Sequence, residues 1–101
     1  MKVLHLNVAA DMTETPNLLK DMQYQVISVI AFHDALKLIQ MESFDALVIE
    51  EGQMHPGTLD FISDARRVRL ELPIFVGSEW GTDLPLTLKS LEAFAPAAEV
   101  Y

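Results

Sequence analysis

Four short apolar runs, separated by amphipathic segments, limit this chain to a small set of folds. The runs lie at residues 3–8, 26–30, 46–49 and 74–77, and they are rich in Val, Leu and Ile. Segments with apolar side chains at helical spacing lie at residues 17–22, 34–41, 58–70 and 83–94. Strands that are apolar on both faces and alternate with such helices predict a parallel sheet covered on both sides. We therefore expect an α/β fold, a small βαβ sandwich with four or five parallel strands.

Composition narrows the classes of function. The 101 residues suffice for one domain, which we place at residues 1–101. Seven Lys and Arg against 15 Asp and Glu give a formal net charge of −8, which repels phosphate backbones and anionic lipids. The chain has no cysteine, and its apolar runs are far shorter than the ~20 residues of a membrane-spanning helix. We expect a cytoplasmic protein that binds neither nucleic acid nor membrane and uses no cofactor.

Several segments follow the order and spacing of a known signalling domain. They are residues 2–4 (KVL), 24–26 (YQV), 35–39 (ALKLI), 44–49 (FDALVI) and 72–74 (LPI). Over residues 2–78 the chain resembles a response-regulator receiver domain. The resemblance implies a flavodoxin-like architecture that is C-terminally truncated, because the family's fifth helix would lie beyond Tyr101.

The resemblance also implies where a phosphorylation site would lie. Members of the family transfer a phosphoryl group to an aspartate after the third strand, with magnesium held by an acidic pair after the first strand. In this sequence the acidic-pair positions match Asn7 and Val8, and the acceptor position matches Glu50. The family's hydroxyl position matches Ser78, and its lysine has no counterpart. We expect a degenerate pocket in a pseudo-receiver that is not an enzyme.

Glu50 allows two interpretations within this expectation. We interpret it as a solvated acid at the end of a strand, where acids are common. The alternative is a permanent negative charge that mimics the phosphorylated state. A different class of function also stays open, a residual phosphoacceptor or metal-dependent enzyme that uses Glu50, Asp11 and Ser78. Incubation with a small phosphodonor and magnesium distinguishes the two classes.

Other motifs for chemistry are sparse in this sequence. His5, His33 and His55 lie in different segments and lack the i, i+4 spacing of a helical metal site. No nucleophile elbow and no Ser/His/Asp signature is visible. We therefore expect neither a metal site nor a catalytic serine.

The segment after the fourth apolar run offers candidates for partner binding. Trp80 lies in a predicted loop, where a large aromatic side chain either caps the core or anchors a partner. We take Glu79, Trp80 and Tyr101 as candidate partner-binding residues, with Tyr101 near the position of the family's switch aromatic. The resemblance implies a phosphorylation-independent role in bacterial-type signalling, with a kinase or a transcriptional regulator as protein partner.

The predicted helices cover the two faces of the sheet unequally. The first helix begins only near Pro16 and the fifth is missing, yet the strands are apolar on both sides. We therefore expect an exposed apolar patch on the face of the first helix. Such patches usually mark an interface, and a symmetric homodimer would close it.

Overall fold

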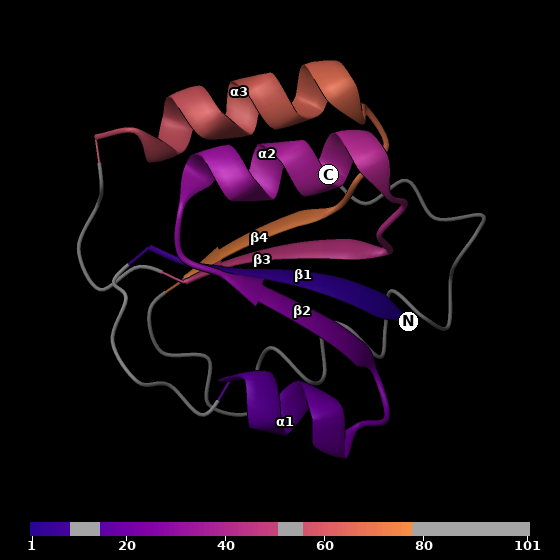
Figure 1. Ribbon diagram of the computed structural model, residues 1–101. Helices are drawn as coiled ribbons and strands as arrows, with labels where there is room; N and C mark the ends of the chain where they lie inside the picture. Colours follow the sequence, from indigo (N-terminus) through magenta and orange to yellow (C-terminus); the bar gives the residue numbers. More distant parts are fainter. Residues whose placement is uncertain (9–14, 51–55, 78–101) are drawn as a thin grey trace.

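The computed structural model describes residues 1–8, 15–50 and 56–77 of the chain. Three helices and four strands alternate along these residues, and the strands form one sheet in the order β2-β1-β3-β4 (Figure 1). All three strand pairs are parallel. The elements are β1 (Lys2–Asn7), α1 (Thr15–Asp21), β2 (Gln25–Val29), α2 (Phe32–Met41), β3 (Ala46–Glu50), α3 (Thr58–Val68) and β4 (Ile74–Gly77).

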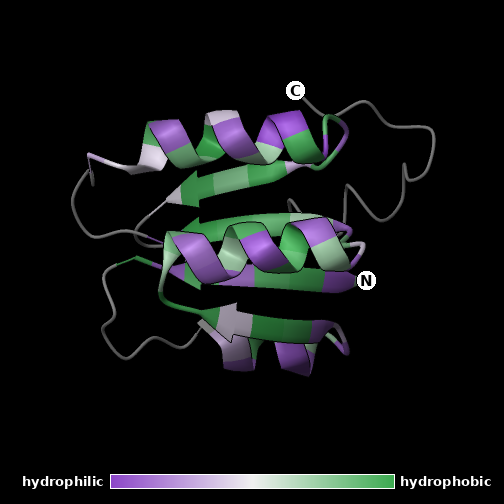
Figure 2. Cartoon of the chain, turned by 45° about the horizontal axis from the view of Figure 1, so that its top comes forward, coloured by the Kyte–Doolittle hydropathy of each residue, from purple (hydrophilic) through white to green (hydrophobic). Residues whose placement is uncertain are grey.

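The α/β fold predicted from the apolar periodicity is confirmed. Each predicted strand lies within one residue of its observed bounds, because near-continuous apolar runs suit strands that are covered on both faces. Figure 2 shows this pattern as largely hydrophobic strands beside helices of mixed hydropathy. The helix predicted at residues 83–94 and a fifth strand fall outside the described residues.

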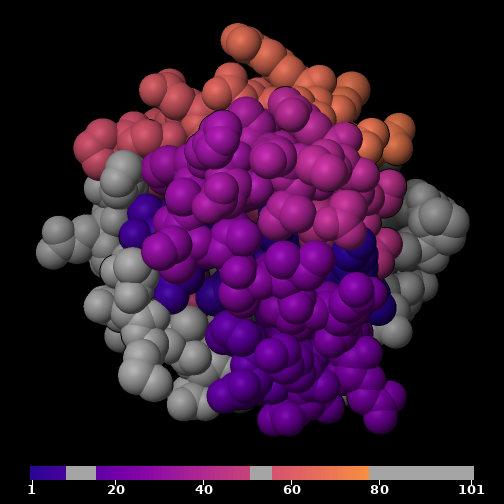
Figure 3. Space-filling model, in the orientation of Figure 1, coloured from indigo at the N-terminus to yellow at the C-terminus, as the bar shows by residue number. Residues whose placement is uncertain are grey.

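The helices form two layers, one on each face of the sheet. α2 and α3 pack side by side on one face, and α1 lies on the other (Figure 1). The space-filling view, in the same orientation, shows the atoms of α1 at the bottom of the molecule and those of α2 and α3 above (Figure 3). The larger core, on the α2–α3 face, contains Leu4, Leu6, Leu47 and Ile49 from the two central strands.

The smaller core, on the α1 face, corrects one expectation from the sequence. Val3, Ala46 and Val48 project from the central strands on this face, and each has an exposed fraction of 0%. The apolar patch predicted for this face is therefore wrong at β1 and β3. The assumption that every strand is buried on both sides is also wrong for β2, an edge strand of the described sheet in which Gln25 and Ser28 are exposed.

The turn after α1 sets the start of β2. Gln23 adopts a left-handed conformation with φ of 65°, and its N–H donates to the Lys20 carbonyl at 2.8 Å. The Tyr24 N–H donates to the Leu19 carbonyl at 3.2 Å, and the two side chains belong to the same buried cluster. This pair of bonds with its apolar contact is a Schellman motif, which ends the helix and turns the chain into the strand.

Candidate functional site

Strand alternation places four polar side chains, those of His5, Asn7, Ser28 and Glu50, on the α1 face of the sheet. In β1, His5 and Asn7 follow Val3 at intervals of two residues, so all three project from one face. Glu50 shares that face because it follows Val48 by two residues in β3. Ser28 lies directly across from His5 in the β1–β2 pairing. Three neighbouring strands therefore bring a hydroxyl, an imidazole and a carboxylate into one row.

The three side chains form a continuous hydrogen-bonded chain. His5 Nε2 lies 2.7 Å from Glu50 Oε1, and His5 Nδ1 lies 3.0 Å from Ser28 Oγ. A carboxylate only accepts hydrogen bonds, so in a neutral imidazole Nε2 carries the proton that is donated to Glu50. Nδ1 is then left with its lone pair, which accepts the hydrogen bond from the Ser28 hydroxyl.

The two ends of this hydrogen-bonded row differ in burial. His5 has an exposed fraction of 1% and Glu50 of 9%, whereas Ser28 is exposed on the edge strand. Water therefore has little access to the His5–Glu50 bond, and the environment strengthens it relative to a surface pair. Solvent therefore reaches this row of side chains at Ser28 and is largely excluded from it at Glu50.

The interpretation of Glu50 as a solvated strand-end acid is wrong. Its residue is buried, and its carboxylate accepts a short hydrogen bond from a histidine of the neighbouring strand. This burial could not be predicted from the sequence, because an acid at the end of a strand has the same sequence context whether its side chain points toward solvent or back along the sheet. Glu50 is therefore a buried, hydrogen-bonded carboxylate and not an exposed surface charge.

The residues expected to form the degenerate pocket lie next to one another where the structure describes them. Asn7 is the register partner of Glu50, and it is buried. The backbone N–H of Val8 donates to the Glu50 carbonyl at 2.9 Å, and the Val8 side chain packs against the larger core. The predicted site residues outside the described part of the chain are Asp11, Ser78, Glu79, Trp80 and Tyr101.

No Ser/His/Asp signature is visible in the sequence, yet the structure brings a serine, a histidine and a glutamate into hydrogen-bond contact. Ser28 and His5 were missed because they belong to no contiguous motif and lie 23 residues apart in the chain. One signal was present in the sequence, since His5 and Ser28 are polar residues inside apolar runs. Only the register of β1 with β2 shows that these two polar positions meet.

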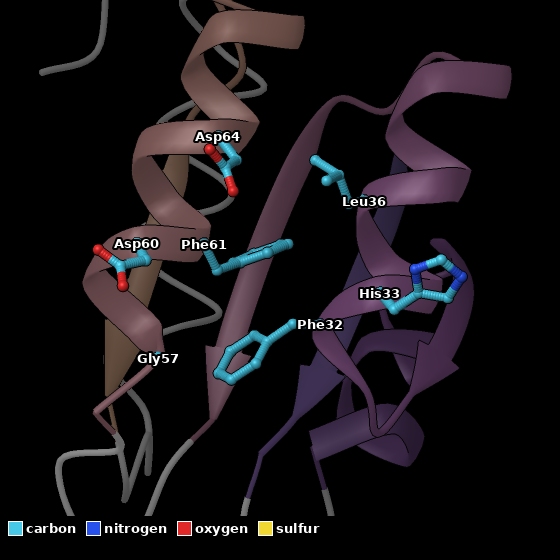
Figure 4. A pocket seen from close by; sticks show the side chains of 7 residues that line it. All are labelled: Phe32, His33, Leu36, Gly57, Asp60, Phe61 and Asp64. Atoms are coloured by element: carbon cyan, nitrogen blue, oxygen red, sulfur yellow. The ribbon is translucent and has the colours of Figure 1, made fainter.

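A separate hollow lies at the surface between α2 and α3. It has a volume of about 260 Å³, and Figure 4 shows Phe61 and Leu36 directed into the space between the two helices, with Phe32 beside them. The rings of Phe32 and Phe61 have their centroids 5.3 Å apart, and Asp60 and Asp64 belong to the α3 side of the rim. Within residues 1–8, 15–50 and 56–77, no group of three His, Asp or Glu residues is arranged to hold a metal ion.

Comparison with known proteins supports the fold. No model of a protein family matches the sequence, and no curated protein matches it either. Among solved structures, the chain is similar to the receiver domain of NtrC4 from Aquifex aeolicus, with a TM-score of 0.66 and 14% sequence identity. The match covers 100% of this chain and 80% of that chain. The predicted receiver-like fold is confirmed, and no described helix is long and apolar enough to cross a membrane.

Proposed function

From the receiver-like fold, we propose that this chain is a phosphorylation-independent module that acts in cytoplasmic signalling through contacts with a protein partner. The observation that carries the proposal is the 2.7 Å bond between Glu50 Oε1 and His5 Nε2. In the receiver family the residue at the position of Glu50 must be an accessible carboxylate. Here the carboxylate is buried and one of its oxygens is hydrogen-bonded to a histidine, which restricts the approach of a phosphodonor.

The residues next to Glu50 also support the proposal that the chain acts without phosphorylation. Phosphoryl transfer in this family depends on magnesium, which prefers carboxylate oxygens and water as ligands. The register partner of Glu50 is the neutral Asn7, and Val8 is apolar. Among the residues that the structure describes, this pocket has no acidic pair, and its candidate acceptor is hydrogen-bonded to His5, which argues against phosphoryl transfer at this position. What the fold retains is a rigid scaffold that presents helices and loops to other proteins.

The proposal is tested by capturing partners in two states. The immobilised chain is exposed to a cell extract before and after treatment with acetyl phosphate and magnesium, and bound proteins are identified by mass spectrometry. We expect the same partners in both states, since the treatment leaves the chain unchanged. Partners that bind only after treatment would contradict the proposal. A kinase or a transcriptional regulator is the class of partner that we propose.

A homodimer is not required for this function. It was predicted from an open apolar face, and that premise fails at β1 and β3 because Val3, Ala46 and Val48 are buried. The homodimer therefore stays a prediction from the sequence.

A further inference from the structure

The hydrogen-bonded residues Ser28, His5 and Glu50 could support a reaction that does not involve phosphorylation of Glu50. We propose that Ser28 is an activated nucleophile, which takes an acyl group from an activated ester, with His5 as its base and Glu50 as the group that positions His5. The juxtaposition that carries the inference is the hydroxyl of an exposed serine, which lies 3.0 Å from one nitrogen of a buried imidazole whose other nitrogen is 2.7 Å from a buried carboxylate.

The tautomer of His5 suits the role of a base toward Ser28. A base must offer its lone pair to the nucleophile, and an isolated imidazole can place its proton on either nitrogen. The Glu50 carboxylate accepts from Nε2 and so stabilises the form in which Nδ1 is free of a proton. The Ser28 hydroxyl then donates to Nδ1 and its oxygen keeps its lone pairs for attack. This is the logic of a nucleophile, a base and an orienting acid, with the two ring nitrogens exchanged relative to the serine proteases.

The sheet holds Ser28, His5 and Glu50 rigidly. All three side chains project from strands of one sheet, so their relative positions are fixed by backbone pairing and not by a loop. His5 is enclosed at an exposed fraction of 1%, which leaves the ring little freedom to turn away from Ser28. A nucleophile held in place before it meets its reagent avoids the entropy cost of alignment.

Ser28 is accessible from solvent. Ser28 lies in β2, the edge strand of the described sheet, and is exposed while its two partners are buried. A reagent can therefore reach the oxygen from solvent without unfolding the pair behind it. Other residues at the buried end of the row, including Asn7, need not move.

The reaction balances without a cofactor. Ser28 Oγ forms a bond to the carbonyl carbon, and the bond between that carbon and the leaving oxygen breaks. The leaving group departs with the electron pair of that bond. The hydroxyl proton passes to His5 Nδ1 and from there to the leaving group, so His5 returns to its starting form. The product is an ester of Ser28 and a free alcohol.

A fluorophosphonate probe tests the nucleophile, because it reacts with serine hydroxyls that have a base and forms a stable adduct with loss of fluoride. The site of labelling is mapped by peptide mass spectrometry. Ser63 serves as the internal control, because it is exposed on α3 and has no such neighbours in the described part of the chain. Since a positioned base supplies roughly 10²–10⁴-fold, we expect Ser28 to be labelled at least about tenfold faster than Ser63.

Substitutions show whether fast labelling of Ser28 comes from its activation by His5 or only from its exposure to solvent. Ser28→Ala should abolish the fast labelling, whereas Ser63→Ala should leave it unchanged. Glu50→Gln can present its amide NH₂ to Nε2, which stabilises the other tautomer and directs a proton at Ser28. In a Glu50→Gln protein whose circular dichroism is native, we expect labelling to slow at least about tenfold.

Two results would overturn the inference. One is labelling of Ser28 at the same rate as Ser63, which would show an ordinary hydroxyl. The other is an unchanged rate in natively folded Glu50→Gln, which would show that the carboxylate does not position the base. Neither result depends on whether the chain accepts phosphate or binds a partner, so the proposed function is judged separately.

Discussion

The carboxylate of Glu50 is largely shielded from water and is hydrogen-bonded to Nε2 of His5, so that bond contributes to the stability of the fold. Hydrogen bonds that involve a charged group contribute about 1.5–3 kcal/mol to stability, and a buried group left without its partner costs a similar amount. An exposed acid contributes far less, because water replaces any partner that it loses. The same residue type therefore has different consequences at buried and exposed positions of this chain.

Glu50→Gln should lower the free energy of unfolding by about 1–2 kcal/mol, because a neutral amide replaces the charged acceptor of a buried hydrogen bond. From the sequence alone, a solvated Glu50 would predict a change within about 0.5 kcal/mol. Urea denaturation followed by circular dichroism measures the difference. Glu71→Gln is the matched control, since Glu71 is exposed, and it should stay within about 0.5 kcal/mol of the wild type. Equal unfolding curves for the two variants would mean that Glu50 is solvated after all.

At the scale of elements, the motif that ends a helix determines the direction in which the chain enters the next strand. α1 has only seven residues, and isolated helices of that length are unstable in water. The Schellman motif at Gln23 and the contact of Leu19 with the sheet hold it in place. In this motif Gln23 adopts a positive φ, a conformation that is sterically unfavourable for a residue with a Cβ atom.

Gln23→Gly should raise the free energy of unfolding by about 0.5–1 kcal/mol, because glycine adopts a φ of 65° without steric cost. Thermal denaturation measures the change. Gln40→Gly is the matched control: Gln40 is also exposed, but it lies inside α2, where glycine should lower stability by about 1 kcal/mol. If both glycine variants were destabilised alike, the left-handed conformation of Gln23 would carry no strain.

The elements were predictable because each depends on a local pattern. Near-continuous apolar runs identified the strands, and apolar spacing identified the helices, as for Ala35 and Ile39 on the buried face of α2. The candidate site was predictable only in part. Glu50 was singled out as the end of a strand and Asn7 by the family resemblance, but the hydrogen bonds that join Glu50, His5 and Ser28 depend on the pairing register. A slip of two residues would keep the same faces buried and would separate these side chains, so the apolar pattern alone does not predict that they meet.

At the scale of the whole molecule, the two buried clusters on opposite faces of the sheet determine what surface is left for association. Large apolar side chains that remain exposed in the described residues are scattered over different elements, namely Ile30, Met41, Leu59, Leu70 and Val76. Single exposed apolar residues are common on monomeric proteins and do not define an interface.

The homodimer predicted from the sequence requires a particle with the mass of two chains at micromolar concentration. Multi-angle light scattering after gel filtration measures that mass. Obligate interfaces typically bury about 2,000 Å² or more in total, so such a dimer would not dissociate on dilution through the micromolar range. The mass of a single chain would contradict the prediction, and it would agree with the burial of Val3, Ala46 and Val48.

The central claim is that the acceptor position of this receiver-like fold is closed, because Glu50 is buried against His5 beside the neutral Asn7. The most direct measurement is the intact mass of the chain after incubation with acetyl phosphate and magnesium. A receiver domain known to accept phosphate from the same donor serves as a positive control. We predict that the control gains the mass of one phosphoryl group while this chain keeps its original mass. A phosphoryl adduct that maps to Glu50 would contradict the claim.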